Sequence, residues 1–557
     1  MKVIKHILLI VLLALCTQQN SMANVRTYDI IVYSGSSAGF TAAIAAAKLG
    51  KKVALLEPGR HIGGMNVEGL GGTDIDNHAE FQNSGAVGGL ALEFYRRIAR
   101  YYHREEAFEA LLARHDKQSG LWRFEPHVAQ QVIDQWLSEY PIDIFYGAII
   151  REQEGVIKKK GIIQEIRLTN GQAFQAKMFI DASLEGDLLA HAGVSTAIGR
   201  EANRQYGEEH NGIRAETTHA QFLVQVDPYR MMGDSTSGLI ATIQPEPLGT
   251  PGEADKHLQA YCFRMCLSKD KNNQLPFTKP ADYRRSDYEI YLRYLKAGGK
   301  LYVPVVSIPN NKTDLGAWHD LSHNLYGMNL GYPEGDQQVR DSILHQHRNF
   351  TQGLFYFLAH DPEVGQLDSA LQREWASWGL AKDEFTDNEG WPRQFYVRDG
   401  RRLVSDMVIT ENHIRKKNPL PLIHPVAIAF WPPDLHSVRR IVRKGYAYNE
   451  GFVFGGDWWR PFGIPYEALV PKAGECRNLL APACPSSSHV AYGAIRIEFT
   501  FMELGQASGA AASLAIDGKH TVQQVPYEQL QALLLKEKAI LALDTATKVH
   551  RGIMALP

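Results

Sequence analysis

The sequence predicts an α/β fold that opens with a Rossmann-like unit. Two observations favour this fold class. An apolar run at residues 28–33 leads into a turn of glycine and serine, an alanine-rich segment and a second apolar run at residues 52–57, which is the strand, turn, helix and strand order of a dinucleotide-binding fold. The chain also has 557 residues. Because a single hydrophobic core stops growing near about 250–300 residues, we expect two or three lobes.

The composition is that of an ordinary globular protein. Apolar residues make up 45% of the chain and charged residues 22%, values that exclude a disordered chain, a collagen-like fibre and a polytopic membrane protein. The formal net charge is −2. The chain therefore lacks the basic excess that binding to nucleic acid or anionic lipid requires, and we expect no nucleic acid partner.

Residues 1–23 have the pattern of a signal peptide. Lys2 and Lys5 precede an apolar run at residues 7–16, and a small-x-small sequence ends at Ala23, after which cleavage is predicted. The run of about ten residues is too short to span a bilayer of ~30 Å, so we expect no transmembrane span in the mature chain. The predicted location is periplasmic or secreted, with a retained N-terminal anchor as the alternative.

The cysteines are interpreted in the light of export. Cys16 closes a stretch that loosely resembles a lipobox, so a lipoprotein is a second alternative, less favoured because Leu15 is bulky where a small residue belongs. Four cysteines remain after cleavage: Cys262, Cys266, Cys476 and Cys484. We expect buried thiols and no zinc site, because no second Cys/His pair has zinc spacing. A disulfide between Cys476 and Cys484 is the alternative in an oxidising compartment.

The turn after the first apolar run is predicted to bind a pyrophosphate. Its residues are Gly35, Ser36, Ser37, Ala38 and Gly39. Amides at the start of the following helix would point at the phosphates, and the helix dipole favours their negative charge. Serines replace the first two glycines of the usual G-x-G-x-x-G pattern, and a serine hydroxyl can still donate to phosphate. The helix is expected to end at Gly50, a typical C-terminal residue.

Glu57 is the predicted ligand of a ribose. It ends the second apolar run, close to the position about 20 residues after the glycine turn where a carboxylate accepts a bond from a ribose hydroxyl. A purely structural strand–helix–strand unit is the alternative interpretation of the turn and Glu57 together.

Three later segments extend the predicted cofactor site and favour a flavin dinucleotide over NAD. Glycines at residues 63–64, continuing to Gly72, let the backbone approach a long cofactor. A strand at residues 177–181 follows an alternating stretch, residues 142–166, that predicts a meander. A small-residue run at residues 505–515 predicts a tightly packed helix, whose N-terminus would face the flavin. The residues assigned to the cofactor here are Gly63, Gly64, Met65, Gly72, Ile149, Asp181, Ala182, Asp187, Arg496, Gly505 and Gln506.

These motifs resemble a known family. The matching strings are YDIIVYSGSSAG, LLEPGRHIGGM, FIDASLEGDLLAHAGV and SSSHVAYGAIRIEFTFMELGQASG. They are similar to those of exported FAD-dependent oxidoreductases of the glutathione-reductase-like flavoprotein class, whose members are often labelled xanthan-lyase-like. The likeness is clearest over residues 27–200 and 465–516, and shorter strings extend it over most of the mature chain.

The resemblance implies a domain organisation. FAD would be the cofactor, held in a discontinuous Rossmann-like lobe of residues 24–204 and 465–525. Residues 205–464 would form an inserted α+β substrate lobe, in which helical patterning recurs at residues 340–357. Residues 526–557 would hold a C-terminal helix that docks on the rest.

Three side chains are the candidate catalytic groups. His489 lies in the C-terminal cofactor segment, and His323 and Tyr396 would line the substrate cleft. Histidine is the usual base near neutral pH, although a structural role for His489 is the alternative. His319 lies four residues before His323, but no third ligand is near, so we expect no metal site. The arginines that could instead face the cleft, and would then suit a carboxylate substrate, are Arg398, Arg401 and Arg402.

The hypothesis from the sequence is an exported FAD-dependent oxidoreductase. A small organic substrate would transfer hydride to flavin N5, and the electron acceptor that reoxidises the flavin is unspecified. Seven of the nine tryptophans fall in the predicted insert. One or two exposed indole rings there would stack on a sugar, so a sugar or sugar-derived alcohol is the first substrate hypothesis. The alternatives are an FAD-dependent amine oxidase, an NAD-dependent dehydrogenase without flavin, and a non-catalytic flavin-binding protein.

Overall fold

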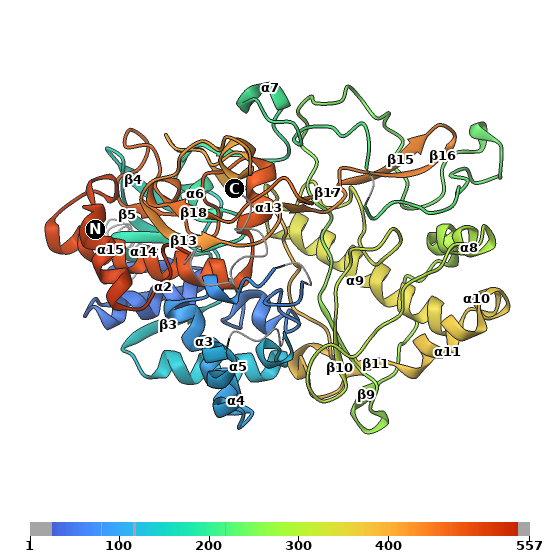
Figure 1. Cartoon of the computed structure of the whole chain (residues 1–557), viewed down its shortest axis with the longest axis horizontal. Coiled ribbons are helices and arrows are strands. Elements are labelled where there is room, and N and C mark those ends of the chain that lie inside the picture. The colour runs from blue at the N-terminus through green and yellow to red at the C-terminus, as the bar shows by residue number, and fades with distance from the viewer. Residues whose placement is uncertain (1–24, 79–80, 115–118, 218, 544–557) are drawn as a thin grey trace, which may run out of the picture.

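The computed structural model describes residues 25–78, 81–114, 119–217 and 219–543. The predicted signal peptide with its cleavage site, Cys16, and the last part of the predicted C-terminal helix lie outside the described residues. The chain forms two lobes that lie side by side (Figure 1). The first lobe is built on a seven-stranded sheet, and the second on a four-stranded sheet with helices α8 to α11.

The seven-stranded sheet confirms the predicted α/β class. Its centre is β1 (Arg26–Tyr33), which pairs in parallel with β2 (Val53–Glu57) on one side and β6 (Ala173–Asp181) on the other. β3 (Ile142–Tyr146) extends the parallel part beyond β2. β1 and β2 are rich in Val, Ile and Leu and buried along most of their length, as parallel strands covered on both faces require.

Strands from both ends of the sequence meet in this sheet. β4 (Val156–Lys159) and β5 (Ile162–Arg167) form the antiparallel meander that leads into β6. β19 (Leu479–Leu480) adds in parallel beside β6, nearly 300 residues later in the chain. The first lobe is therefore discontinuous in sequence, as predicted.

Two helices pack unusually closely on one face of the sheet. They are α2 (Ser37–Lys48) and α14 (Glu498–Gly518). A Cβ on Gly505 would overlap the carbonyl oxygen of Ala38, and one on Gly509 would overlap that of Ala42. The small-residue run thus lets the two helix backbones touch. α2 ends before Gly50, which has φ +74°, the left-handed conformation expected of a terminating glycine.

Three further helices of the first lobe lie below these two in the view of Figure 1. They are α3 (Gly89–Tyr101), α4 (Glu105–Arg114) and α5 (Pro126–Ser138). α5 begins with Pro126, whose fixed φ and missing N–H suit the first helical position. α15 (Tyr527–Lys536) docks on α14 but is shorter than the predicted C-terminal helix.

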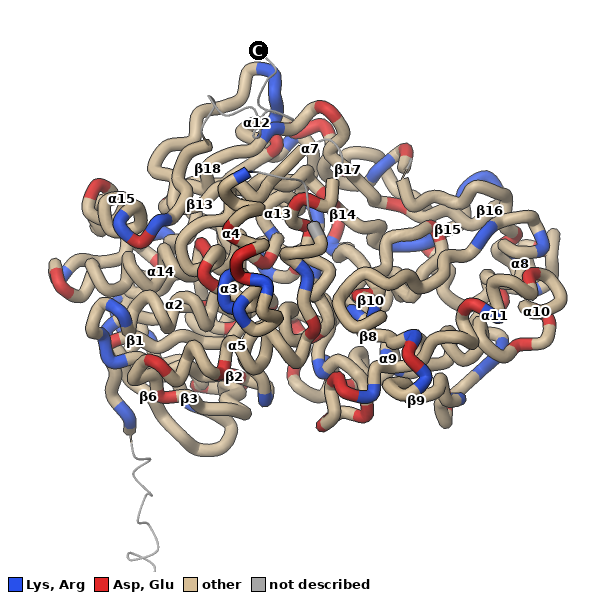
Figure 2. The backbone as a smooth tube through the Cα atoms, turned by 60° about the horizontal axis from the view of Figure 1, so that its bottom comes forward, with Lys and Arg blue, Asp and Glu red and all other residues tan. Residues whose placement is uncertain are grey.

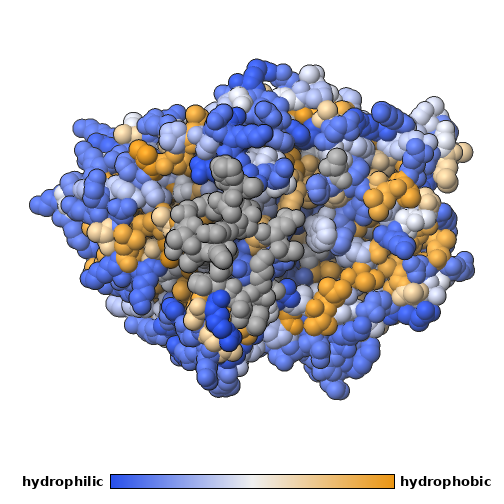
Figure 3. Space-filling view, in the orientation of Figure 1, coloured by the Kyte–Doolittle hydropathy of each residue, from blue (hydrophilic) through white to orange (hydrophobic). Residues whose placement is uncertain are grey.

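The second lobe is α+β, as predicted. Its sheet has the order β10 (Lys312–Leu315), β8 (Met265–Ser268), β11 (Gly379–Ala381) and β9 (Gln274–Leu275), all antiparallel. Its longest helix is α9 (Gln337–His360), which Asp336 caps by accepting a bond from Val339 N. The shorter helices are α8 (Glu289–Lys296), α10 (Pro362–Leu367) and α11 (Ser369–Ser377). Apolar side chains gather over this lobe on one face (Figure 3).

The chain returns to the first lobe earlier than the predicted boundary at residue 464. β13 (Pro425–Ala429) and β18 (Phe462–Pro465) form a ribbon that packs on α14. The hairpin between them, β15 (Arg439–Arg443) and β16 (Tyr446–Glu450), reaches back over the second lobe. Short strand pairs complete the junction: β7 (Thr196–Ala197) with β12 (Arg402–Leu403), and β14 (Asp434–Leu435) with β17 (Val453–Phe454).

Charges and thiols are distributed as in an ordinary globular protein. Lysines and arginines are interspersed with aspartates and glutamates over both lobes (Figure 2). Cys262, Cys266, Cys476 and Cys484 are buried free thiols, so the alternative disulfide between Cys476 and Cys484 is wrong in this structure. Among the helices of the described residues, none combines the length and apolarity needed to cross a bilayer.

Candidate active site

The predicted pyrophosphate turn lies between β1 and α2. Ser36 is the N-cap of α2, and its Oγ accepts from Gly39 N at 3.3 Å and donates to Ala182 O at 2.6 Å. A Cβ on Gly39 would overlap the carbonyl oxygen of Ser34. Ser36 therefore performs a capping role that glycine could not, which accounts for its departure from the glycine pattern.

Glu57 lies beside this turn, at the end of β2. Its carboxylate accepts bonds from Gly35 N at 2.6 Å and Gly59 N at 2.5 Å. Burial raises the pKa of Glu57 to about 7, against the opposing effect of the two amides. The carboxylate of Glu57 thus holds the turn in place, and it also lines a narrow slot beside the turn.

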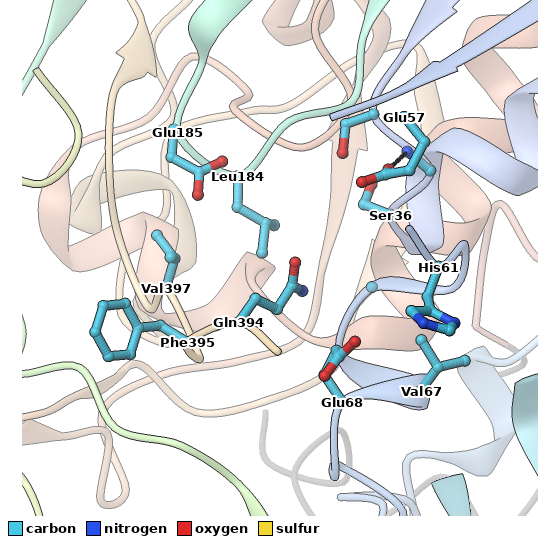
Figure 4. Close-up of a pocket in the computed structure, with 13 residues that line it drawn as sticks. Ser36, Glu57, His61, Val67, Glu68, Leu184, Glu185, Gln394, Phe395 and Val397 are labelled. Carbon is cyan, nitrogen blue, oxygen red and sulfur yellow. Dashed lines mark hydrogen bonds between the residues drawn. The ribbon is translucent and has the colours of Figure 1, made fainter. Parts of the chain in front are cut away.

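A narrow slot runs along the turn, and we call it the acidic slot. Its free volume is about 30 Å³, and the carboxylates of Glu57, Glu68 and Glu185 face it (Figure 4). Burial raises the pKa of Glu68, although Arg393 Nη1 lies 3.1 Å from its carboxylate. Burial and then the charge of Asp187 raise the pKa of Glu185. Hydroxyl groups, which donate to carboxylates, suit this slot better than anions do.

The predicted double glycine closes over the start of α2. Gly64 has φ +56°, and a Cβ there would lie 3.1 Å from both Ser36 Cα and Ser37 N. Any larger residue would fill the space in front of the helix amides. Met65 follows and is buried against Leu70 and Tyr396, so it links this segment to the second lobe.

Asp181 is the last residue of β6 and Ala182 follows it, and the structure gives Asp181 a role within its own segment. Its carboxylate accepts bonds from Ser183 N, Ser183 Oγ and Leu189 N, and it is fully buried. Burial raises its pKa to about 7. We assigned Asp181 to the cofactor, but both of its oxygens are used to fold the turn before α6 (Asp187–His191).

Asp187 and Ile149 line a cavity of about 280 Å³ beyond the ends of β1 and β2. Arg340 of α9 makes a bidentate pair with Asp187, at 2.8 Å and 2.6 Å, and Arg401 Nη1 lies 3.3 Å away. The second lobe therefore touches the predicted cofactor path at this point. Gly72 lies elsewhere, where its amide donates to Asp314 Oδ2 at 3.0 Å.

Gly505 and Gln506, which the sequence assigns to the cofactor, contact other parts of the protein instead. Gly505 faces the backbone of α2, as described above. Gln506 Oε1 accepts a bond from Leu90 N at 2.8 Å and so holds the start of α3. The small residues of this helix serve helix packing, so the sequence pattern did not identify cofactor contacts at Gly505 and Gln506.

A larger cavity of about 500 Å³ lies where the two lobes meet, and we call it the central cavity. Its aromatic walls are Trp318, Tyr396, Trp431, Phe452 and Phe454. Its charged and polar residues include Asp74, His78, His219, Arg264, Asp434, His436 and Arg496. These residues come from distant segments of the chain, so only Tyr396 and Arg496 were identified from the sequence. The glycines preceding Asp74 were the one local signal that could have found a further member.

Tyr396 and Arg496 are brought together in this cavity. Arg496 Nη1 donates to the Tyr396 hydroxyl at 2.8 Å, and Nη2 donates to Asp434 O at 2.7 Å. Burial raises the pKa of Tyr396, and the charge of Arg496 opposes that shift. Among the described residues, Arg496 Nε is buried without a hydrogen-bond partner, which leaves one donor for a ligand.

The two predicted catalytic histidines do not line the central cavity. His323 is buried, with Nδ1 3.1 Å from the Tyr302 hydroxyl and Nε2 3.0 Å from Phe263 O. Burial lowers its pKa to about 3. Both nitrogens are thus occupied by protein groups, and the prediction of His323 as the base is wrong. His489 is also buried, and its Nδ1 lies 3.2 Å from Asp399 Oδ2.

The arginines proposed for the cleft are internal as well. Arg398 and Arg402 are fully buried. Arg398 donates to Ala317 O at 3.1 Å, and Arg402 pairs with Glu201 at 2.7 Å. Because each is already bonded within the protein, neither offers a free cation to a carboxylate substrate.

One acidic cluster has the ligand types of a metal site but holds a lysine. The side chains of Glu125, His127, Asp383 and Glu384 converge. Lys312 Nζ lies 2.7 Å from Glu125, 2.7 Å from Asp383 and 2.8 Å from Glu384. The ammonium group therefore occupies the centre of the cluster and offsets part of its negative charge, and the cluster joins the first lobe to the second.

The first-lobe residues fit an elongated dinucleotide. Capped amides open α2, Gly64 leaves space before them, and carboxylates line the adjoining slot. Among the described residues, Asn66 Oδ1 is buried without a partner beside this turn, as Arg496 Nε is beside the central cavity. These orphaned groups lie where a ligand would satisfy them.

The sequence pattern of a family described as FAD dependent oxidoreductase matches residues 29–534. This match covers nearly the whole chain. The chain belongs to the FAD-dependent oxidoreductase family. FAD is accordingly its cofactor, and a reading without flavin, as an enzyme dependent on NAD alone, is set aside. The match carries neither of the narrower labels, glutathione-reductase-like or xanthan-lyase-like.

Solved structures match parts of this chain at low identity. L-proline dehydrogenase from P. horikoshii is 15% identical over 32% of this chain and 59% of its own, with a TM-score of 0.22. L-amino acid deaminase from Proteus vulgaris is 14% identical over 38% of this chain and 56% of its own, with a TM-score of 0.22. T. acidophilum thioredoxin reductase is 17% identical over 28% of this chain and 35% of its own, with a TM-score of 0.17.

The chain thus spans between about a third and three fifths of the length of these solved structures. Likenesses this distant carry no argument about activity or substrate. No curated protein matches this chain.

Proposed function

We propose that this family member is an exported enzyme that oxidises a small hydroxyl-bearing substrate, with a sugar or sugar-derived alcohol as the first candidate. Bound FAD would supply the acceptor, at flavin N5, for the hydride that leaves the substrate. The observation that carries the substrate class is the central cavity, at the junction of the lobes, with its aromatic walls and bonded polar groups. Export rests on the pattern of residues 1–23 alone.

The aromatic walls support a sugar. Trp318 is 60% exposed at the cavity, whereas Trp431 is buried beside Phe81. An exposed indole that faces a cavity provides a flat apolar platform for the C–H face of a sugar ring. A volume of about 500 Å³ lies in the range of small-molecule sites.

The charge balance supports a neutral substrate over a carboxylate. Arg264 makes a bidentate pair with Asp314, at 2.7 Å through both Nε and Nη2. Arg496 has the carbonyl of Asp434 at 2.7 Å and its carboxylate at 3.4 Å. Each cation has an acid partner, so these groups can donate to hydroxyls but leave no uncompensated positive charge for a uronate.

An amine is the second candidate. Asp74 adds a carboxylate to a cavity in which the arginines are already neutralised, and aromatic faces attract cations. This combination would suit a protonated amine. The choice between the two substrates therefore depends on an experiment.

The test is anaerobic mixing of the purified holoenzyme with panels of neutral sugars, sugar alcohols, uronates and amines. Loss of the oxidised-flavin absorbance with neutral sugars or sugar alcohols is the expected result. Bleaching with amines alone would replace the proposal by amine oxidation, and bleaching with uronates alone would overturn the charge argument. A protein that no panel reduces would instead be a flavin-binding protein without this activity.

A further inference from the structure

Asp74 reaches the central cavity from a loop that its glycines fix in place. Gly69 has φ +108°, and a Cβ there would overlap the carbonyl oxygen of Arg264. A Cβ on Gly71 would overlap the carbonyl oxygen of Phe124. The loop is therefore threaded between backbone of the second lobe and backbone of the first. It has no room to shift, so the position of Asp74 is set before any ligand arrives.

The side chain of Asp74 is held by one bond and keeps one oxygen open. Asn83 Nδ2 donates to the backbone carbonyl of Asp74 at 2.8 Å, and Asn77 Nδ2 donates to Oδ1 at 3.1 Å. Within the described residues, Oδ2 has no hydrogen-bond partner. The carboxylate thus faces the cavity with an acceptor that a substrate hydroxyl can use.

The surroundings of Asp74 favour proton uptake. Burial raises its pKa, the charge of Arg264 lowers it, and the charge of Asp434 raises it again. Arg264 and Arg496 have their own acid partners, Asp314 and Asp434. Asp74 is therefore the carboxylate left without a cation of its own, in a place where a raised basicity serves general base catalysis.

His436 also lines the central cavity and is of a residue type that can act as a base, but its environment opposes proton uptake. It is buried, and burial together with the charges of Arg398, Arg496 and Arg264 holds its pKa well below the ordinary range. Its Nε2 lies 3.9 Å from Asp434 Oδ1. A histidine that takes up a proton becomes positively charged, whereas a carboxylate that takes up a proton becomes neutral. In a buried site beside arginines, forming the positive histidine costs more free energy than neutralising the carboxylate.

We propose that Asp74 is the catalytic base that takes the hydroxyl proton of the substrate. The inference rests on the proposed function. The substrate O–H bond would break as the proton moves to Asp74 Oδ2, and bound FAD would supply the two-electron acceptor for the hydride of the C–H bond. The carbon–oxygen single bond would become a carbonyl, so the two electrons that the alcohol loses are the two that FAD would accept.

Other charged groups in and around the central cavity also affect the pH dependence of the reaction rate. Those with direct electrostatic influence on it are Arg264, Asp314, Tyr396, Asp434 and Arg496. The histidines that line the same cavity are His78, His219 and His436. Substitution of Asp74 is therefore needed to show which part of the pH dependence of the rate comes from Asp74 and which part comes from these histidines.

The test compares the holoenzyme with Asp74→Asn and with Asp434→Asn, a second cavity carboxylate. Asparagine keeps the shape of Asp74 and can still accept the bond from Asn77. We expect Asp74→Asn to keep its FAD absorbance and its melting temperature. Its rate of anaerobic FAD reduction by the alcohol should fall by about 10²–10⁴-fold, the contribution typical of a general base. The acid limb of the pH dependence of that rate should disappear.

Binding supplies the readout that does not depend on turnover. Sugar binding to the oxidised enzyme, followed by tryptophan fluorescence, should change by less than about threefold in Asp74→Asn. Asp434→Asn should weaken binding, because it disturbs Arg496, and yet retain the acid limb. Asp74→Glu should recover part of the lost rate.

The outcomes distinguish this inference from the proposed function. If alcohols reduce the parent enzyme and Asp74→Asn at similar rates, or if the acid limb persists in Asp74→Asn, Asp74 is not the base and the proposed function stands. If no alcohol reduces the parent enzyme, both proposals are overturned together.

Discussion

The hydroxyl of Ser37 donates a hydrogen bond to the carboxylate of Glu498, across 461 positions of the sequence. Ser37 opens α2 and Glu498 opens α14, so the N-termini of the two helices lie side by side. Asn66 Nδ2 donates to the same hydroxyl at 2.6 Å. Two positive helix ends therefore face one place, which is the electrostatic arrangement that suits an anionic cofactor.

Stability should depend on pH through the buried carboxyl groups of this region. Burial raises the pKa of Glu57, Asp181 and Glu498 to about 7 in each case. The folded state then binds more protons than the unfolded state between about pH 4.5 and 7, so stability is greatest at the lower end and falls as pH rises. One such group contributes roughly 3 kcal/mol, so we expect the three together to lower the free energy of unfolding of the FAD-free protein by at least about 3 kcal/mol across this window.

The measurement is urea unfolding at a series of pH values. Glu498→Gln, which keeps an acceptor for Ser37, should flatten the slope in the same window. A stability that rises from pH 5 to pH 7, or a slope that Glu498→Gln leaves unchanged, would contradict this assignment.

Close contact between α2 and α14 should make Gly505 intolerant of any side chain. Gly505→Ala places a methyl group against the Ala38 carbonyl and Thr41. Overpacking against backbone cannot be relieved by a rotamer change, so we expect a loss of at least about 3 kcal/mol together with poor retention of FAD. Gly474→Ala is the matched control, because nothing lies within 4 Å of a Cβ there. The measurements are the melting temperature and the content of bound flavin. Equal values for Gly505→Ala and Gly474→Ala would contradict this prediction.

Lys312 should be essential to the junction between the lobes. Among the described residues, Lys312→Met leaves buried Glu125 without a cation and leaves buried Glu384 with His127 alone, whose Nδ1 lies 2.7 Å away. Removing one partner of a buried ion cluster costs about 3–5 kcal/mol. Lys269→Met breaks the exposed pair with Glu374 and a cation–π contact with Trp378, and should cost about 1 kcal/mol.

Adding Glu384→Gln to Lys312→Met should restore part of the lost stability, since it removes one stranded charge. Denaturant unfolding of the three variants checks this order. Equal losses for Lys312→Met and Lys269→Met would show that the cluster is not a structural link.

Trp318 should contribute to substrate affinity and not to folding. Its exposed indole faces the central cavity, so Trp318→Ala should change the melting temperature little. We expect the affinity for a neutral sugar to fall about tenfold, which is ~1.4 kcal/mol. Met231→Ala removes another exposed apolar side chain outside the cavity and serves as the comparison. Fluorescence titration measures the Kd for the sugar. The same Kd in the parent enzyme, Trp318→Ala and Met231→Ala would show that Trp318 does not stack on the substrate.

Local patterns in the sequence predicted the part of the fold that local rules control. The strands and the helix on either side of Gly39 each have a single, regular hydrophobic pattern. The length of α2 then fixes where the next strand ends, which is at Glu57. The early return of β13 to the first lobe was not predictable in this way. Its place is decided by packing on α14, a partner far along the chain.

The candidate site shows the same limit. His323 was chosen for its chemistry, but its bonds to Tyr302 and Phe263 depend on tertiary packing. Asp74 and Arg264 share a cavity although neither has a motif that points to the other. Residue type alone therefore could not show that both ring nitrogens of His323 are bonded within the protein, nor that Asp74 and Arg264 line one cavity.

The late position of β19 and α14 in the chain has a consequence for biogenesis. A ribosome releases β1, β2 and α2 first, and these elements must wait for the C-terminal fifth of the polypeptide before their exposed apolar faces are covered. Nascent chains and fragments clipped before residue 479 would then lack one wall of the nucleotide cradle. We therefore expect FAD to bind only when the C-terminal segment that holds β19 and α14 is present.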